Sequence, residues 1–378
     1  MGDARSNGHL TWRPPRRDDL CMRITAALGS PRSAFGTWLM TALVAAAVAT
    51  PSAVHSAQVE ARRSRTAPRT PWGAPDLQGI WTSDDARSVP LQRPGQFGER
   101  QLLTDEEFAE RTKRDDETRV DTRSAAGTFV GEVGSRTLRQ TSLVVDPPDG
   151  RVPAVTPEAQ RKAADIAVLR SRLPVSWEDR SISDRCITRG PLAALPTLYG
   201  NGLRIVQNPG WVAINYEMIH ETRVIPLDGR PHISQTIRQY LGDARGHWEG
   251  DTLVIETTNF TDKTTVGATA TSEALRLVER LTRVGADALS YEATIDDSRT
   301  WTKPWSVVVP LTTQSGYEIF PYECHEGNYA LRNILSAARH EERAVDEALK
   351  KGLEPPVRSE WQGNTGFLPA DPSFGRPR

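Results

Sequence analysis

The second half of the chain alternates short apolar runs with turn signals. Runs rich in Val, Ile, Leu, Tyr and Trp recur roughly every 8 to 12 residues, a spacing typical of antiparallel meanders. They occupy residues 203–207, 211–227, 253–258, 275–284, 289–295 and 305–311. So many strands must protect their edges from pairing with other chains, and a closed barrel does this economically. The pattern therefore predicts a mainly β fold, an antiparallel up-and-down (lipocalin-like) barrel over residues 196–328 with flanking α-helices.

Helical signals flank the predicted barrel on both sides. Thr104 followed by Glu107 forms a capping box, and Thr156 followed by Pro157 places an N-cap before a first-turn proline. After the barrel, residues 329–351 show an amphipathic helical pattern. These signals predict a helical and extended N-terminal wrap at 76–195, a C-terminal helix at 329–353 and an irregular tail at 354–378.

The order of residue types in the N-terminal segment is that of a secretory signal peptide. Several arginines precede an apolar run at 38–49, and small residues follow Pro51. The run is shorter than the about 20 apolar residues that span a bilayer, so a retained anchor is the less favoured alternative. We predict a signal peptide at 1–56 and a disordered lead-in at 57–75. The protein is then expected to be periplasmic or secreted, without stable membrane insertion after the signal is removed.

Charge and missing motifs exclude several classes of protein. The 378 residues carry 47 Lys and Arg against 48 Asp and Glu, a formal net charge of -1, and both signs are spread along the chain. No basic field is present that would hold nucleic acid. The sequence also lacks a Walker loop, a G-x-S-x-G elbow, an H-E-x-x-H motif and paired C-x-x-C segments. The common nucleotide-binding, serine hydrolase and zinc protease classes are thereby disfavoured, and a small-molecule ligand or substrate remains the expected partner.

Export changes the expected state of the cysteines. Cys21 leaves with the signal, so Cys186 and Cys324 remain in an oxidising compartment. A disulfide between them is the favoured interpretation. Two unpaired thiols, or Cys324 as a metal ligand beside His325, are the alternatives, and the metal is disfavoured because no second cysteine stands at ligand spacing.

Charged residues share strand faces with apolar ones in the predicted barrel. In 275–284, Glu279 lies on the same face as Leu277 and Leu281, and in 211–227 His220 lies on the same face as Tyr216. The charges could pair on the outer face of the sheet. Alternatively, the barrel lumen is partly polar because it holds a ligand.

Three histidines in or beside the predicted barrel are the main candidates for chemistry. An imidazole held by a carboxylate can serve as a general acid or base near neutral pH. Imidazoles with a carboxylate could also hold a divalent metal, which irregular spacing disfavours, and each residue alone could be purely structural. The candidate catalytic residues are His220, His232, His325, Glu217 and Glu279. The candidate ligand-binding residues are Arg223, Arg283, Tyr216, Trp248, Tyr291 and Tyr322, with Arg223 and Arg283 as plausible carboxylate partners and Trp211, Trp301 and Trp305 as further apolar surface.

Seven segments carry a resemblance to a known family. They are PDLQGIW (75–81), DPPDGR (146–151), RCITRG (185–190), EMIHETR (217–223), LDGRPH (227–232), GHWEGDT (246–252) and CHEGN (324–328). Together they resemble the signature segments of a large family of exported bacterial proteins that has no general activity assigned to it. The resemblance implies export and a single fold over nearly all of the mature chain. It also implies that His220, His232 and His325, which fall within these segments, share one site.

Two functions follow as hypotheses. The first is an exported barrel enzyme that binds a largely apolar small molecule, with the histidines and a carboxylate performing acid-base chemistry of a hydrolase, lyase or cyclase type. The second is a lipocalin-like binding or carrier protein in which the same polar residues only orient a ligand. An adhesion or scaffold module is less favoured, because its charges would be expected on the outer face alone.

Overall fold

The computed structural model of the protein describes residues 68–124, 132 and 134–355. The predicted signal peptide, the first part of the predicted lead-in and nearly all of the predicted tail lie outside the described residues. Residues 68–75, the described end of the lead-in, form a turn that a bridge between Arg69 and Pro75 closes. Within the described part of the chain, no helix is long and apolar enough to cross a membrane.

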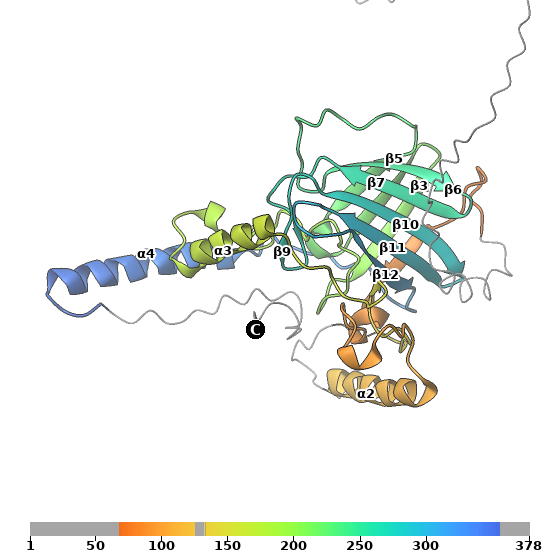
Figure 1. The fold of residues 1–378 in the computed structure, drawn as a ribbon, viewed down its shortest axis with the longest axis horizontal. Helices are drawn as coiled ribbons and strands as arrows, with labels where there is room; N and C mark the ends of the chain where they lie inside the picture. Colours follow the sequence, from red (N-terminus) through yellow and green to blue (C-terminus); the bar gives the residue numbers. More distant parts are fainter. Residues whose placement is uncertain (1–67, 125–131, 133, 356–378) are drawn as a thin grey trace, which may run out of the picture. The chain divides into compact units, whose positions relative to one another are not determined.

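Ten antiparallel strands form one sheet (Figure 1). Its order is β5-β4-β3-β1-β12-β11-β10-β7-β6, and β2 pairs with β12 beside this path. The strands are β1 (Gly79–Thr82), β2 (Val144–Asp146), β3 (Gly202–Asn208), β4 (Trp211–Tyr216), β5 (Thr222–Pro226), β6 (Asp243–Glu249), β7 (Thr252–Thr258), β10 (Arg276–Gly285), β11 (Ala288–Asp296) and β12 (Trp305–Thr312). A separate hairpin joins β8 (Thr265–Val266) to β9 (Thr269–Ala270). The prediction of a mainly β fold with a large antiparallel sheet is confirmed.

The two edge strands of the sheet, β5 and β6, contact each other. Gly246 on β6 approaches this contact so closely that a Cβ there would lie 2.8 Å from Ile225 Cγ2 and 2.8 Å from Leu227 Cδ2. Among the described residues no strand pairing joins β5 to β6. The edges therefore meet through side-chain packing rather than through a hydrogen-bonded ladder.

One face of the sheet carries the hydrophobic core. Along β11 every second residue is buried, including Leu289 and Tyr291. The registers with β10 and β12 place Leu281 and Val309 opposite Tyr291. Because side chains alternate across a strand, these residues share one face, and they belong to one buried cluster. The alternation in the sequence is the pattern that this burial requires.

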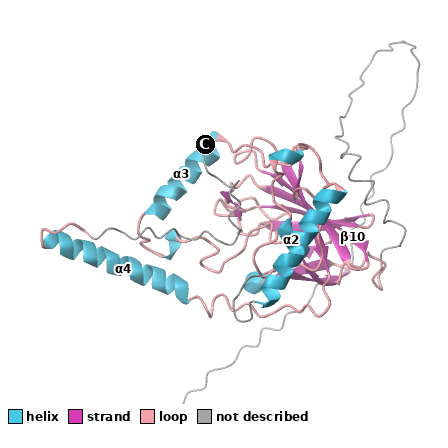
Figure 2. Cartoon of the chain, turned by 90° about the horizontal axis from the view of Figure 1, so that it is seen from below, coloured by secondary structure: helices cyan, strands magenta, loops and turns pink. Residues whose placement is uncertain are grey.

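Among the described residues, three α-helices lie outside the strands (Figures 1 and 2). They are α2 (Asp105–Ser124), α3 (Pro157–Ser171) and α4 (Tyr329–Lys350), and the short 3-10 turns are η1 (Asp84–Ser88), η2 (Gly95–Phe97), η3 (Trp177–Asp179) and η4 (Met218–His220). At the start of α2, the Glu107 N–H donates to Thr104 Oγ1 at 3.3 Å and the Thr104 N–H donates to Glu107 Oε2 at 2.8 Å. Before α3, Thr156 Oγ1 accepts from the Ala159 N–H at 3.2 Å. Both predicted helix starts are confirmed.

The predicted continuous strand at 211–227 is wrong at its centre. The chain leaves β4 after Tyr216, makes the turn η4 and enters β5 at Thr222. Ile219 and His220 have positive φ angles of 65° and 41°, which a strand cannot accommodate. The expected face-sharing of His220 with Tyr216 is lost at this break, and β4 and β5 instead form a hairpin.

Candidate functional site

A buried ion pair stands on the core face of the sheet. Arg223 of β5 and Glu279 of β10 are 6% and 0% exposed, and their side chains form two hydrogen bonds, Nη1 to Oε1 at 2.9 Å and Nη2 to Oε2 at 2.6 Å. Tyr291 Oη donates to Glu279 Oε1 at 3.0 Å, and Arg223 Nη2 donates to Thr257 Oγ1 at 3.2 Å. Arg223 Nη1 also lies 3.5 Å from Tyr216 Oη. Four of the predicted site residues therefore meet in the interior.

This interior cluster binds its own members rather than presenting free groups. Both Glu279 oxygens accept hydrogen bonds from within the cluster. Burial raises the pKa of Tyr216 to about 12, so its hydroxyl stays protonated. Burial alone would lower the pKa of Arg223, but the Glu279 carboxylate raises it overall. The cluster is a structural ion pair in the sheet interior, whose polar groups bind one another.

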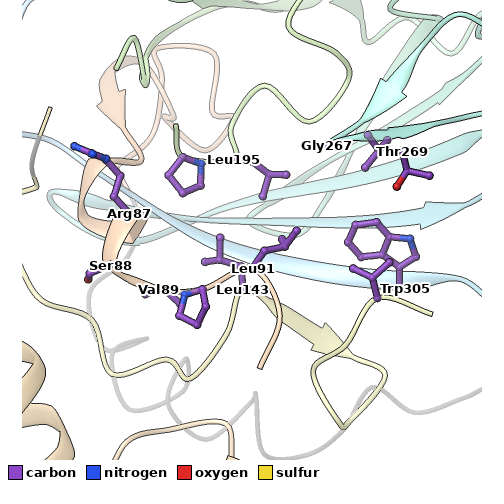
Figure 3. A pocket seen from close by; sticks show the side chains of 13 residues that line it. Arg87, Ser88, Val89, Leu91, Leu143, Leu195, Gly267, Thr269 and Trp305 are labelled. Carbon is purple, nitrogen blue, oxygen red and sulfur yellow. The ribbon is translucent and has the colours of Figure 1, made fainter. Parts of the chain in front are cut away.

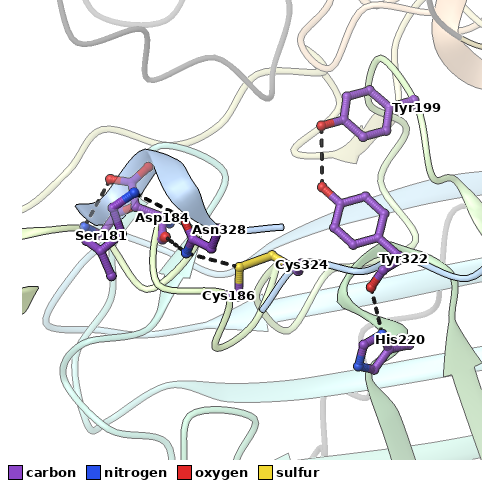
Figure 4. The surroundings of a disulfide bond; sticks show 9 residues. Ser181, Asp184, Cys186, Tyr199, His220, Tyr322, Cys324 and Asn328 are labelled. Atoms are coloured by element: carbon purple, nitrogen blue, oxygen red, sulfur yellow. Dashed lines mark hydrogen bonds between the residues drawn. A yellow bond between two sulfur atoms is a disulfide. The ribbon is translucent and has the colours of Figure 1, made fainter. Parts of the chain in front are cut away.

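His220 and His325 lie together on the surface, beside the disulfide. Their ring centroids are 6.3 Å apart, and both residues are exposed. His220 Nδ1 lies 2.7 Å from the Tyr322 carbonyl oxygen, and Figure 4 shows this contact next to the bond between Cys186 and Cys324. The predicted disulfide is confirmed. It links the loop before β3 to the segment before α4, which also carries Tyr322 and His325.

The third predicted histidine has a different partner. His232 Nδ1 lies 2.9 Å from Asp243 Oδ2 on β6, and Arg245 Nη1 donates to the other oxygen of that carboxylate at 2.7 Å. No contact between described residues links His232 to His220 or His325. The structure thus pairs two of the three imidazoles and gives the third its own carboxylate.

Glu217 belongs to a second group of carboxylates, next to η1. Tyr317 Oη donates to Glu217 Oε2 at 2.5 Å, and burial raises the pKa of Glu217. Asp84 accepts from Asn201 Nδ2 at 2.8 Å. Burial, and then the charge of Asp84, raise the pKa of Glu132 to about 7. Burial first, and then repulsion from Asp84 and Glu217, thus leave Glu132 partly protonated near neutral pH.

The remaining predicted ligand-binding residues have structural contacts. Arg283 Nη1 donates to the Asp76 carbonyl at 2.8 Å, and its guanidinium lies 5.3 Å from the centre of the Trp81 ring. Trp248 packs against the core. Tyr322 Oη lies 3.4 Å from Tyr199 Oη. None of these side chains lines the cavity described next.

A cavity of about 300 Å³ lies beyond the end of β1, beside the first residue of β12. Its walls come from the segment after β1, from Leu143 and Val152 on either side of β2, from the loop before β3 and from the β8–β9 hairpin. The lining residues are Arg87, Ser88, Val89, Pro90, Leu91, Leu143, Val152, Leu195, Pro196, Val266, Gly267, Thr269 and Trp305. Figure 3 shows Arg87 at one end and Trp305 at the other, with Leu91 and Leu143 between them.

The lining of this cavity is mainly apolar. Among the described residues around it, the polar side chains are Arg87, Ser88, Thr269 and the indole N–H of Trp305, without any carboxyl or imidazole group. Apolar walls with a few polar groups are characteristic of small-molecule sites, whose volumes begin at about 300 Å³. The cavity therefore has the size and apolar lining of a small-molecule site, and its described lining residues include no acid-base pair.

The sequence did not point to this cavity. Its lining comes from five separate segments, and among the lining residues only Trp305 was singled out, as apolar surface. The one local signal was the sequence Val89-Pro90-Leu91, an apolar stretch in a region without helical or strand periodicity. Such a stretch indicates burial but not the partner against which it is buried.

Comparisons with known proteins supply no relative. No family model matches the chain, and no curated protein or solved structure shows significant similarity to it. The resemblance to the exported bacterial family therefore stays a prediction. Among the described residues, no group of three or more His, Cys, Asp or Glu side chains could hold a metal ion.

Proposed function

We propose that this chain is an exported protein that binds a small, largely apolar molecule in the cavity beside Trp305. The single observation that carries this proposal is the cavity itself, with its apolar walls and two polar ends. Because its lining lacks acid-base groups, binding without catalysis fits the cavity better than turnover does.

The sheet that supports this cavity is proposed to be a barrel of the lipocalin-like kind. Its two edge strands contact each other, and Arg223 of β5 reaches across the core face to Glu279 of β10. A flat sheet would hold β5 and β10 far apart, because five strands lie between them in the order. A rolled sheet would bring them together, and the mouth of such a roll is a common position for ligand sites.

Export is supported by two independent features. The N-terminal segment has the order of a signal peptide. The disulfide between Cys186 and Cys324 suits an oxidising compartment. A periplasmic or secreted protein that binds a small molecule is the function that these features support together.

The proposal is tested by filling the cavity. Val152 lines it, and Val152→Phe adds a ring to its wall, whereas Val206→Phe makes the same change at an exposed position on β3. We expect the full-length protein to bind 1,2,3,4-tetrahydronaphthalene in isothermal titration calorimetry. Val152→Phe should weaken this binding at least tenfold, and Val206→Phe should leave it unchanged. Equal affinities in all three proteins would show that the ligand binds elsewhere, and absence of binding in the wild type would refute the proposal.

A second candidate function rests on the histidine pair. His220 and His325 are close and exposed, and the positive φ angles of Ile219 and His220 mark backbone strain of the kind that gathers at functional sites. Acid-base catalysis of a hydrolase, lyase or cyclase type is the corresponding hypothesis. Under it, His220→Ala and His325→Ala should abolish turnover of chromogenic esters, whereas the exposed His247→Ala control should not. Equal rates in all variants would remove this candidate.

A further inference from the structure

Two hydrogen-bond donors at the cavity lack an acceptor. Trp305 is 2% exposed, and its Nε1 has no hydrogen-bond partner. Arg87 Nη1 is buried and equally without a partner. Both residues line the cavity, at opposite ends of it (Figure 3). Leaving a buried donor unpaired costs free energy, so such groups call for a partner that the protein alone does not supply.

The neighbouring side chains do not provide that partner. Trp301 packs edge-on against Trp305, with ring centroids 5.5 Å apart, and its own Nε1 is also unpaired. Thr269 lines the same end of the cavity but makes no hydrogen bond to Trp305. Among the described lining residues, the two buried side-chain atoms without a hydrogen-bond partner are Arg87 Nη1 and Trp305 Nε1, and both are donors. A ligand that complements this cavity must therefore bring acceptors.

The charge around Arg87 disfavours an anionic ligand. Asp84 and Glu132 are the acids whose charges act on the Arg87 guanidinium. Asp84 and the ionised fraction of Glu132 offset its positive charge, and they would repel a carboxylate or phosphate placed beside it. At the other end, the Trp305 indole is neutral and lies among apolar walls, where an unpaired charge would lose its hydration.

We propose that the ligand of this cavity is a neutral, mostly apolar molecule that carries a carbonyl oxygen, as a ketone or an ester does, and that this oxygen accepts a hydrogen bond from Trp305 Nε1. The inference rests on the proposed function and specifies the ligand of that same site. The volume sets the size: a cavity of roughly 150 Å³ holds benzene, and this one, at about 300 Å³, has room for a molecule of about two fused rings.

The test compares ligands of nearly equal shape. 1-Tetralone differs from 1,2,3,4-tetrahydronaphthalene by one carbonyl oxygen, and 1-naphthoate carries a negative charge on a similar ring system. Affinities are measured by isothermal titration calorimetry on the full-length protein and on Trp305→Phe, which keeps an aromatic ring and removes the N–H. Circular dichroism checks that the variant is folded.

We expect the wild type to bind the ketone about fivefold to tenfold more tightly than the hydrocarbon, and to bind 1-naphthoate at least tenfold more weakly than the ketone. In Trp305→Phe the preference for the ketone should vanish or reverse, because the oxygen of the ketone loses hydration without gaining a donor.

Equal wild-type affinities for ketone and hydrocarbon would overturn the inference and leave the proposed function standing. Tighter binding of 1-naphthoate would overturn the choice of a neutral ligand. Absence of binding by all three would refute the proposed function itself. The wild-type comparison decides the matter even if Trp305→Phe does not fold.

Discussion

The buried pair of Arg223 and Glu279 allows a quantitative test of how the sheet interior is stabilised. Replacing Arg223 by Met keeps most of the side-chain stem and removes the guanidinium. Glu279, which is 0% exposed, then loses two of its hydrogen-bond donors and retains only the Tyr291 hydroxyl at 3.0 Å. A buried carboxylate without its counter-charge is costly, since the protein interior screens and solvates it poorly.

The expected loss is large compared with the stability of a domain. Removing one partner of a buried ion pair costs about 3 to 5 kcal/mol, out of a total free energy of unfolding of roughly 5 to 15 kcal/mol. The double variant Arg223→Met/Glu279→Leu removes both charges. It should therefore be more stable than either single variant, although Tyr216, Tyr291 and Thr257 keep unpaired hydroxyls.

The assay is urea denaturation followed by tryptophan fluorescence, with the exposed pair of Arg276 and Glu256 as control. That pair joins β10 to β7 at 2.7 Å, with side chains 52% and 37% exposed. Arg276→Met should cost no more than about 1 kcal/mol. For the interior pair, the double variant should lose at least about 3 kcal/mol less than the sum of the two single losses. A loss below about 1 kcal/mol in Arg223→Met, or additive losses in the double variant, would refute the reasoning.

Three further predictions concern the rest of the fold. Between the ordinary pKa of Glu132, near 4.5, and its raised pKa of about 7, the folded chain holds a proton on Glu132 that the unfolded chain has lost, so the free energy of unfolding should fall as the pH rises across this window. Denaturation curves of Glu132→Gln at several pH values should lack this slope. An unchanged slope would contradict the assignment to Glu132. Reducing the disulfide, which spans 138 residues, should lower the free energy of unfolding by about 2 to 5 kcal/mol, and a Cys186→Ser/Cys324→Ser variant should show the same stability with and without reductant. Thr104→Ala should cost about 0.5 to 2 kcal/mol by removing the cap of α2, with Thr104→Ser as a control that stays close to the wild type.

Local signals in the sequence predicted local structure well. The caps at Thr104 and Thr156 depend on residues within one helical turn, so their sequence patterns suffice to locate the helix starts. The strand alternation around Tyr291 equally reflects contacts between neighbouring strands. The break at Ile219 could not be predicted in this way, because nothing in its side chain favours a positive φ angle and the surrounding structure imposes it.

Of the candidate functional residues, only the buried ion pair between β5 and β10 could be anticipated from the sequence. Glu279, a charge in the middle of an apolar strand face, required a partner, and Arg223 was a plausible one before their contact was known. The cavity has no such signature. Its lining residues are ordinary apolar side chains, and only the packing of five distant segments makes them into a site.

The separation of the interior cluster from the cavity predicts that stability and the proposed ligand binding can vary independently. The Arg223 cluster lies on the core face and draws its hydrogen bonds from β4, β5, β7, β10 and β11. The cavity takes one residue from β12, and most of its other walls come from the segment after β1, the flanks of β2 and the β8–β9 hairpin. Substitutions at Leu91 or Val152 should therefore reshape the cavity while leaving every bond of the cluster in place. Changes at sites with no shared partners add nearly independently, so we expect substitutions at Leu91 or Val152, which lie outside the strands, to alter the proposed ligand binding without loss of the sheet.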